Sequence, residues 1–178
     1  GNLVLTRIFP YIDEITLLSM SIFHILEILK ENGKKFIFIG DKHQCLGVDN
    51  IEYTEKEFFK RLVDYNYLTL DKWEENKTRF TKPYFDFLNE IIALDNKQRI
   101  FLHACSKIQL QTTRDINPTE INISWRRKTA DKSTVHKSQG KTHKELITIY
   151  ELDEMTPRIA YTALSRVGDF KDIQICLE

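Results

Sequence analysis

The sequence lacks an excess of charge of either sign. Its 178 residues include 26 Lys and Arg and 26 Asp and Glu, which gives a formal net charge of zero. This balance excludes a global positive field, the simplest means of holding nucleic acid or an anionic membrane, so such a partner needs a local basic patch. Hydrophobic residues make up 42% of the chain, which excludes a disordered protein and allows a sizeable core.

Cysteine is scarce, and long apolar runs are missing. The three cysteines, Cys45, Cys105 and Cys176, lie far apart and form no CxxC pair, which argues against a disulfide framework or a structural zinc site. We therefore expect a reducing, intracellular setting. No run reaches the roughly 18 apolar residues that span a bilayer, and no signal-peptide pattern opens the chain, so we expect no membrane partner. The chain starts at Gly1 without a methionine, which favours a processed or excised piece of a longer protein.

Strand-like and helix-like segments alternate along the chain. The patterns predict strands over residues 8–12, 36–39, 67–70, 121–125, 146–150 and 173–177, and helices over 16–31, 54–65, 83–92 and 157–166. This order predicts an α/β layer architecture, with a domain boundary near Asn66. The continuous apolar run 36–39 is typical of a parallel strand covered on both faces, and Thr54 and Glu57 form a capping box that predicts a helix start. We expect polar loops over residues 105–120 and 134–142.

Two motifs follow predicted strands in the first half. Asp13 and Glu14 end the first strand, where many nucleotide-hydrolysing folds use an Asp to hold Mg²⁺ and a Glu to orient the attacking water. Because such acid pairs are common, a solvated strand end is the alternative. Gly40-Asp41-Lys42-His43-Gln44 ends the second strand, where the Gln44 amide could sense a phosphate or water, with a simple turn as the alternative. Ligands of parallel sheets gather at the carboxyl ends of the strands.

Two further motifs lie in the second half. Residues 134–142 read Thr-Val-His-Lys-Ser-Gln-Gly-Lys-Thr. They are not a P-loop, because Val135 stands where a P-loop has its first glycine and a strand-like run follows instead of a helix. We interpret them as a polar loop for phosphate or backbone contacts. Residues 160–166, Ala-Tyr-Thr-Ala-Leu-Ser-Arg, predict a short helix whose terminal Arg166 either complements the helix dipole or reaches toward a phosphate site.

In this order, the four motifs resemble motifs II, III, V and VI of superfamily 1 helicases. The likeness is to the Pif1/RecD-like branch, especially versions from large DNA viruses, and it covers residues 8–175. His-Lys-Ser-Gln-Gly and Tyr-Thr-Ala-Leu-Ser-Arg are its specific strings. The resemblance implies an α/β fold of two RecA-like (P-loop NTPase-type) parallel-sheet domains. Residues 1–66 would form an incomplete first domain with motifs II and III, and residues 67–178 a second domain with motifs IV, V and VI.

The resemblance also implies a function. The chain would be part of an ATP-dependent helicase that uses ATP and Mg²⁺ to move along single-stranded DNA, or RNA, and to unwind duplex DNA at an intracellular site of replication or repair. Asp13 would hold Mg²⁺, Glu14 would act as the catalytic base, and Gln44 would couple the γ-phosphate to the nucleic-acid face. Arg79 falls at the motif IV arginine, near a phosphate, although a solvated charge is the alternative. Arg166 would be an arginine finger, a role worth about 10³–10⁵ in rate in phosphoryl transfer.

The same resemblance places Gly140 and Lys141 at the nucleotide. Eight residues would line the nucleic-acid strand, namely Trp125, Arg126, Arg127, Lys128, His136, Lys137, Ser138 and Gln139. Between residues 126 and 144, seven Lys and Arg accompany a lone acid, Asp131. The net charge of zero therefore hides a local basic strip and argues only against indiscriminate coating of DNA.

The sequence departs from the family at two points. No Walker A loop precedes Asp13, and the interval between Trp125 and Thr134 is too short for the inserted small domain of many relatives. The chain is therefore either an excised or truncated piece, with the missing N-terminal part of the helicase as its partner, or a degenerate relative. In both cases we expect that it does not hydrolyse ATP efficiently alone. Two alternatives stay open: a non-catalytic nucleic-acid-binding or interaction module derived from a helicase, and an unrelated α/β domain with chance motif matches.

Overall fold

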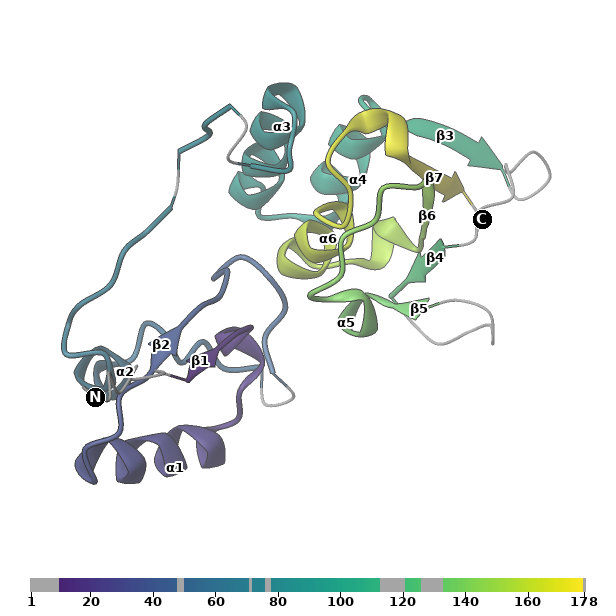
Figure 1. The fold of residues 1–178 in the computed structure, drawn as a ribbon. Coiled ribbons are helices and arrows are strands. Elements are labelled where there is room, and N and C mark those ends of the chain that lie inside the picture. Colours follow the sequence, from purple (N-terminus) through teal and green to yellow (C-terminus); the bar gives the residue numbers. More distant parts are fainter. Residues whose placement is uncertain are drawn as a thin grey trace. The chain divides into compact units, whose positions relative to one another are not determined.

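The chain folds into two compact units, shown in Figure 1. The structure is a computed structural model that describes residues 10–47, 50–70, 72–75, 78–112, 121–125 and 133–177. Gly1–Lys42 and Leu46–Thr69 form the first unit, and His43–Cys45 and Leu70–Glu178 form the second. The main division follows Thr69, and the segment 43–45 belongs by its contacts to the second unit.

The first unit packs helices against a short parallel sheet. Its elements are β1 (Tyr11–Ile12), the 3₁₀ helix η1 (Ile15–Leu17), α1 (Met20–Glu31), β2 (Ile37–Phe38) and α2 (Glu57–Leu62). β1 and β2 pair in parallel. The buried core consists of Phe23, Leu26, Tyr53, Phe59 and Leu62. This core lies between α1, α2 and one face of the sheet, which is the layered arrangement that the alternating pattern predicts.

One face of this sheet is exposed, whereas the sequence predicted that the strand 36–39 is covered on both faces. Phe36 and Phe38 pack against the core, but the side chains of Ile37 and Ile39 are 52% and 49% exposed. The prediction of coverage on both faces was therefore wrong for this strand. Adjacent residues of a strand point to opposite faces, and within the described part of the unit the core covers one face. The predicted helix over 16–31 begins later, at Met20, because Leu18 is extended and separates η1 from α1.

Two local predictions in the first unit were also wrong. The hydroxyl of Thr54 donates to the Glu52 carboxylate instead of capping a helix, and α2 begins at Glu57. The segment 67–70 is not a strand, and Tyr67, Leu68 and Leu70 are 73%, 83% and 88% exposed. Its alternating pattern meets no described partner strand, and a strand is stable only through such pairing.

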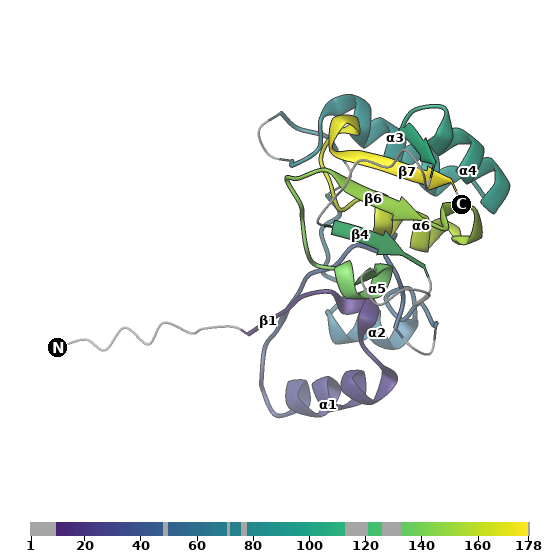
Figure 2. The same cartoon turned by 90° about the vertical axis from the view of Figure 1, so that its right-hand side faces the viewer.

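The second unit contains a five-stranded parallel sheet in the order β3-β7-β6-β4-β5, of which Figure 2 shows the central strands. The strands are β3 (Gln109–Thr112), β4 (Ile121–Ser124), β5 (Ser133–Thr134), β6 (Ile147–Tyr150) and β7 (Ile173–Leu177). The parallel α/β prediction is confirmed here. β3 lies within residues 105–120 and β5 reaches into residues 134–142, so the two predicted loops are partly strands.

Helices α3 (Lys82–Ala93), α4 (Lys97–Cys105) and α6 (Pro157–Leu164) lie on one side of this sheet (Figures 1 and 2). In register across the three central strands, Ile123, Ile149 and Ile175 are fully buried in the core that these helices complete. The opposite face is polar, and there Gln174 Nε2 donates to Thr148 Oγ1 at 2.8 Å. The remaining elements are α5 (Val135–Ser138), η2 (Leu152–Glu154) and η3 (Phe170–Asp172).

Among the helices that the structure describes, none is long and apolar enough to cross a bilayer.

Candidate nucleic-acid and phosphate interface

The motif at residues 134–142 forms a single helical turn, α5, that follows β5 directly. Val135 is fully buried and Ser138 is 2% exposed, whereas His136 and Lys137 are exposed. The Ser138 hydroxyl donates to the Val135 carbonyl at 2.7 Å, which closes the turn. Two buried residues therefore hold α5 on the core, and the two residues between them project outward.

Arg166 stabilises this turn through hydrogen bonds to the backbone. The side chain is 1% exposed, and its Nη1 atom donates to the carbonyls of Ser138 and Lys141, both at 3.2 Å. Its Nε atom donates to the Thr162 carbonyl at 2.7 Å, and Nη2 to the Ser165 hydroxyl at 2.9 Å. The guanidinium thus joins α6 to both ends of the segment 138–141.

Gly140 makes this closure possible. Its φ of +77° lies in the left-handed region, which glycine adopts without steric cost. The chain turns there and brings the Lys141 carbonyl within reach of Arg166. Gly140-Lys141-Thr142 follows α5 and starts no helix, so the exclusion of a P-loop is confirmed.

α6 is itself fixed to α3. The buried Tyr84 hydroxyl donates to the Leu164 carbonyl at 2.8 Å, at the last residue of α6. Burial raises the pKa of Tyr84 far above its ordinary value, so the phenol stays neutral and keeps its proton for this bond. The end of α6, two residues before Arg166, is therefore held in place by α3.

Arg79 lies beside the same loop, but on the surface. Its Nη1 donates to the Thr142 hydroxyl, and its Nη2 donates to the Ser165 carbonyl at 2.8 Å. The guanidinium also lies 4.8 Å from the centre of the Phe80 ring. Arg79 is exposed although these contacts hold it in place, which suits an arginine that meets an anion from outside.

The backbone of Arg79 is held by Gly168. A Cβ atom at residue 168 would lie 2.3 Å from the Arg79 carbonyl oxygen, so only glycine allows this approach. Thr81 N donates to the Gly168 carbonyl at 2.9 Å and secures the crossing. The sequence did not predict that Arg79 contacts Thr142, Ser165 and Gly168, because these residues lie more than 60 positions away and no local pattern marks the contact.

His143 follows the loop, and its backbone N–H donates to the Arg166 carbonyl at 2.8 Å. Burial, Arg166 and Lys141 lower the pKa of the imidazole, and Glu145 raises it by less. Burial, and after it the two positive neighbours, therefore disfavours the charged form of His143.

This pKa predicts a pH dependence of stability. The unfolded chain binds the proton at about pH 6.5, and the folded chain binds it only at lower pH, so the free energy of unfolding falls as the pH drops below about 6.5. We expect His143→Gln to lose less stability than the wild type between about pH 7 and about pH 5. Urea unfolding at each pH measures this difference, and equal losses in both proteins would contradict the prediction.

Trp125 and His136 bring β4 and α5 together. Their ring centres lie 5.8 Å apart, with 33° between the planes. Trp125 directly follows β4, and its ring is partly buried against the core, whereas His136 is exposed. The structure thus brings two of the residues that were predicted to line the nucleic-acid strand into contact. Arg126, Arg127 and Lys128 lie outside the described residues.

Gln44 belongs to the second unit through its neighbours. Cys45 N donates to Thr162 Oγ1 at 2.8 Å, and Arg158 Nη1 donates to the Gln44 carbonyl at 3.4 Å. The Gln44 side chain is 9% exposed, and among the described residues its buried Oε1 has no hydrogen-bond partner. Burial raises the pKa of the Cys45 thiol, which therefore stays protonated. The Gln44 segment and Arg166 thus share Thr162, one through its hydroxyl and one through its carbonyl.

Asp13 and Glu14 lie in the first unit, at the end of β1. The Glu14 N–H donates to Asp13 Oδ1 at 2.8 Å, and Glu14 has a left-handed φ of +53°. Asp13 is exposed. Across the described ranges, no three His, Cys, Asp or Glu side chains cluster as metal ligands. One carboxylate at a strand end still fits Mg²⁺, which keeps several water ligands and takes one or two carboxylates plus substrate phosphates.

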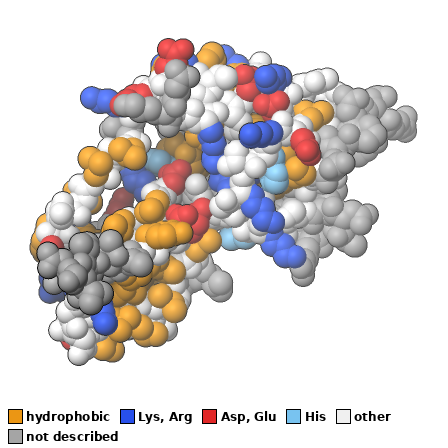
Figure 3. All heavy atoms as spheres, viewed as in Figure 1, with side chains coloured by type: hydrophobic (Ala, Val, Ile, Leu, Met, Phe, Trp, Pro, Cys, Tyr) orange, Lys and Arg blue, Asp and Glu red, His pale blue; other side chains and the backbone are white. Residues whose placement is uncertain are grey.

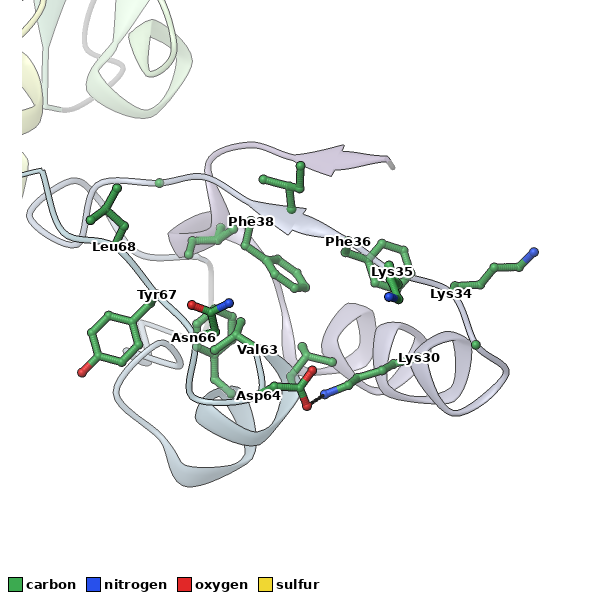
Figure 4. A pocket seen from close by; sticks show the side chains of 16 residues that line it. Lys30, Lys34, Lys35, Phe36, Phe38, Val63, Asp64, Asn66, Tyr67 and Leu68 are labelled. Atoms are coloured by element: carbon green, nitrogen blue, oxygen red, sulfur yellow. Dashed lines mark hydrogen bonds and ion pairs between the residues drawn. The ribbon is translucent and has the colours of Figure 1, made fainter. Parts of the chain in front are cut away.

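The first unit also has a pocket of about 750 Å³, seen in Figure 4. Phe36, Phe38 and Val63 give it apolar walls, and Lys30 forms an ion pair of 2.6 Å with Asp64 at its edge. Gly40 of the motif 40–44 lines this pocket, but none of the residues to which the sequence assigned a catalytic or binding role does. On the second unit, Lys, Arg and His side chains gather on the face seen in Figure 3.

Two solved helicase structures are similar to this chain. The complex of arterivirus nonstructural protein 10, a helicase, with DNA has a TM-score of 0.54 and 16% identity, and the match covers 93% of this chain and 38% of that one. A structure of Pif1 helicases that unwind forked double-stranded DNA has a TM-score of 0.51 and 14% identity, covering 93% of this chain and 68% of that one. No protein-family model and no curated protein matches the sequence.

At these identities the likeness shows the fold alone. The chain spans 38% of the length of the arterivirus helicase, so the activity of a whole enzyme does not follow from the match. The mixed α/β structure with parallel sheets is what the two comparisons match. The chain therefore has a mixed α/β fold that matches the RecA-like domains of these helicases.

Proposed function

We propose that the chain is part of an ATP-dependent helicase whose second unit holds a single strand of nucleic acid at α5. The observation that carries this proposal is the geometry of α5. Two buried residues hold the turn, while the exposed His136 and Lys137 lie between them, and the His136 ring contacts Trp125. A cationic group and aromatic rings on a fixed support are the combination that binds single strands. The DNA in the arterivirus helicase complex, which is similar in fold, supports the same use.

We propose that Arg79, rather than Arg166, contacts a phosphate of the nucleotide. Its guanidinium is exposed and already positioned by Thr142 and Ser165, so little ordering is needed on binding. We propose that Arg166 positions the segment with Gly140 and Lys141 beside it. A role as an arginine finger would require Arg166 first to break its four hydrogen bonds.

The other nucleotide residues keep their proposed roles. Asp13 would hold Mg²⁺ and Glu14 would be the base for the attacking water. Gln44, whose buried Oε1 has no hydrogen-bond partner in the described part of the chain, would couple the phosphate to the nucleic-acid face. ATP with Mg²⁺, when bound, supplies the phosphoryl group whose hydrolysis drives the movement. Because the sequence contains no Walker A loop, we expect no efficient turnover by these residues alone.

A second candidate is a non-catalytic nucleic-acid-binding module derived from a helicase. The surface at α5 would serve both functions equally. The two candidates differ in their response to ATP, which is measured in a longer protein that carries a Walker A loop. We expect ATP to change the nucleic-acid affinity of a helicase and to leave the affinity of a binding module unchanged.

The test is the binding of a fluorescent oligothymidylate to the 178-residue chain, followed by anisotropy at several salt concentrations. We expect affinity to fall steeply with salt, because each phosphate contact releases counterions. Lys137→Ala should weaken binding and lower the slope of log K against log salt by about 0.7, the value for one contact with a single strand.

Lys107→Ala is the matched control, since Lys107 is exposed in the same unit but follows α4. It should bind as the wild type does. Absence of binding at about 50 mM salt, or equal effects of the two substitutions, would overturn the proposed function.

A further inference from the structure

The pocket of the first unit has the size and the lining of a small-molecule site. Its volume of about 750 Å³ lies within the range of roughly 300–1,000 Å³ that is usual for ligand pockets. Phe36, Phe38 and Val63 form its apolar walls, and Asn66 reaches it from the segment that follows α2 (Figure 4). Apolar walls with a few polar groups are typical of a site that binds a small molecule.

The charged groups at this pocket are mostly cationic. Among the residues that the structure describes, three lysines, Lys30, Lys34 and Lys35, and one acid, Asp64, line it. Lys30 Nζ donates to Asp64 Oδ1 at 2.6 Å and to the Arg61 carbonyl at 2.7 Å, so these two charges balance each other. Lys34 and Lys35 are exposed, and within the described residues their side chains have no anionic partner. An anion in the pocket would therefore meet two unpaired positive charges.

The wall that follows α2 is held in place without a ligand. Asp64 and Tyr65 have left-handed φ values of +53° and +56°, which residues other than glycine rarely adopt. The ion pair with Lys30 fixes Asp64, and the Tyr65 hydroxyl donates to the Glu57 carboxylate. The chain therefore turns sharply after α2 and brings Asn66 to the pocket. Little conformational freedom is lost when a ligand binds to such a wall.

We propose that this pocket binds an amphipathic anion, a small molecule with a hydrocarbon body and one carboxylate. Phe36, Phe38 and Val63 remove the hydrocarbon from water, which is favourable in proportion to the area buried. The two unpaired lysines attract the carboxylate. The Asn66 amide, which makes no side-chain hydrogen bond in the described part of the chain, donates to it. No residue assigned to nucleic acid or nucleotide takes part, so the inference goes beyond the proposed function.

Three probes separate the contributions of the hydrocarbon and the charge. They are octanoate, decanoate and decyltrimethylammonium, a cation with the same chain as decanoate, each used below its micelle concentration. Isothermal titration calorimetry with the 178-residue chain gives their affinities. We expect decanoate to bind roughly 15-fold more tightly than octanoate, the effect of burying two further methylene groups. Decyltrimethylammonium should bind more weakly than decanoate, because the lysines repel its charge.

Substitutions of exposed lysines test the charge without disturbing the core. Lys35→Ala should weaken the binding of decanoate about 2- to 5-fold, as expected for one exposed ion pair. Lys35→Glu should abolish the preference for decanoate over the cation. Lys56→Ala is the matched control, because Lys56 is exposed in the same unit and does not line the pocket. It should bind decanoate as the wild type does.

Nuclear magnetic resonance locates the bound probe. Decanoate should shift the amide signals of residues 34–38 and 63–68, which supply most of the lining. Shifts confined to other residues, or equal affinity for decanoate and the cation, overturn the proposal. Loss of decanoate binding in a longer protein that contains this chain also overturns it, because another segment would then fill the pocket. Binding to phosphatidylserine vesicles without binding of free decanoate overturns it and assigns the lysines to a lipid surface. None of these measurements uses nucleic acid, so their failure leaves the proposed function in place.

Discussion

Arg166→Ala lowers the free energy of unfolding of the second unit by about 3–5 kcal/mol. Three backbone carbonyls and one hydroxyl lose a charged donor, and a buried acceptor without a partner costs about 1–3 kcal/mol. The deleted side chain also leaves a cavity, because Arg166 is 1% exposed. Urea unfolding followed by tryptophan fluorescence measures the change, since Trp73 and Trp125 both belong to the second unit.

The control for this prediction is Arg99→Ala, in the same unit. Arg99 is exposed and lies 3.8 Å from Asp95, an ion pair of the kind that contributes little. Its removal should change stability by less than about 0.5 kcal/mol. Arg166→Lys should fall between the two, because lysine keeps the charge but not the planar set of donors. An Arg166→Ala protein that unfolds at the same urea concentration as Arg99→Ala would show that the buried bonds contribute nothing.

Phe23→Ala unfolds the first unit and leaves the second folded. Phe23 is fully buried, and its ring centre lies 5.4, 5.6 and 5.7 Å from those of Tyr53, Phe58 and Phe59. Loss of a buried phenylalanine costs about 3–5 kcal/mol. A unit of this size has a total stability of the same order, at about 0.05–0.15 kcal/mol per residue.

Amide hydrogen exchange, read by mass spectrometry, measures the two units separately. We expect the peptides of α1 and α2 to lose protection, while tryptophan fluorescence reports an unchanged transition of the second unit. Ile25→Ala on the same helix is the control, because Ile25 is 52% exposed and its loss should cost little. A Phe23→Ala protein in which both units lose stability together would mean that the two units unfold as one.

Several elements were predictable because the pattern that forms them is local. The alternating run 121–125 became β4, and the apolar runs 146–150 and 173–177 became β6 and β7. Pro83 lies in the first turn of α3, as expected for a residue without an N–H.

Other elements were missed for identifiable reasons. α4 carries a weak apolar pattern, with Ile100 and Ala104 buried, and its clearest signal is Asn96, whose side chain caps the helix. β3 (Gln109–Thr112) is mostly polar and is a strand because it pairs with β7. The segment 67–70 has the reverse property, a strand-like pattern without a described partner. Pairing between distant residues decided both cases.

By itself, the sequence determined the α/β class, the order of most elements and the candidate site residues at the ends of these elements. These follow from periodicity and from motif strings, which are properties of neighbouring residues. Only the tertiary structure decided which of two arginines is buried. Arg166 and Arg79 look alike in the sequence, but one lies inside the second unit and the other on its surface. The difference comes from partners such as Ser138 and Ser165, 28 and 86 residues away, and a short window of sequence cannot specify contacts over such separations.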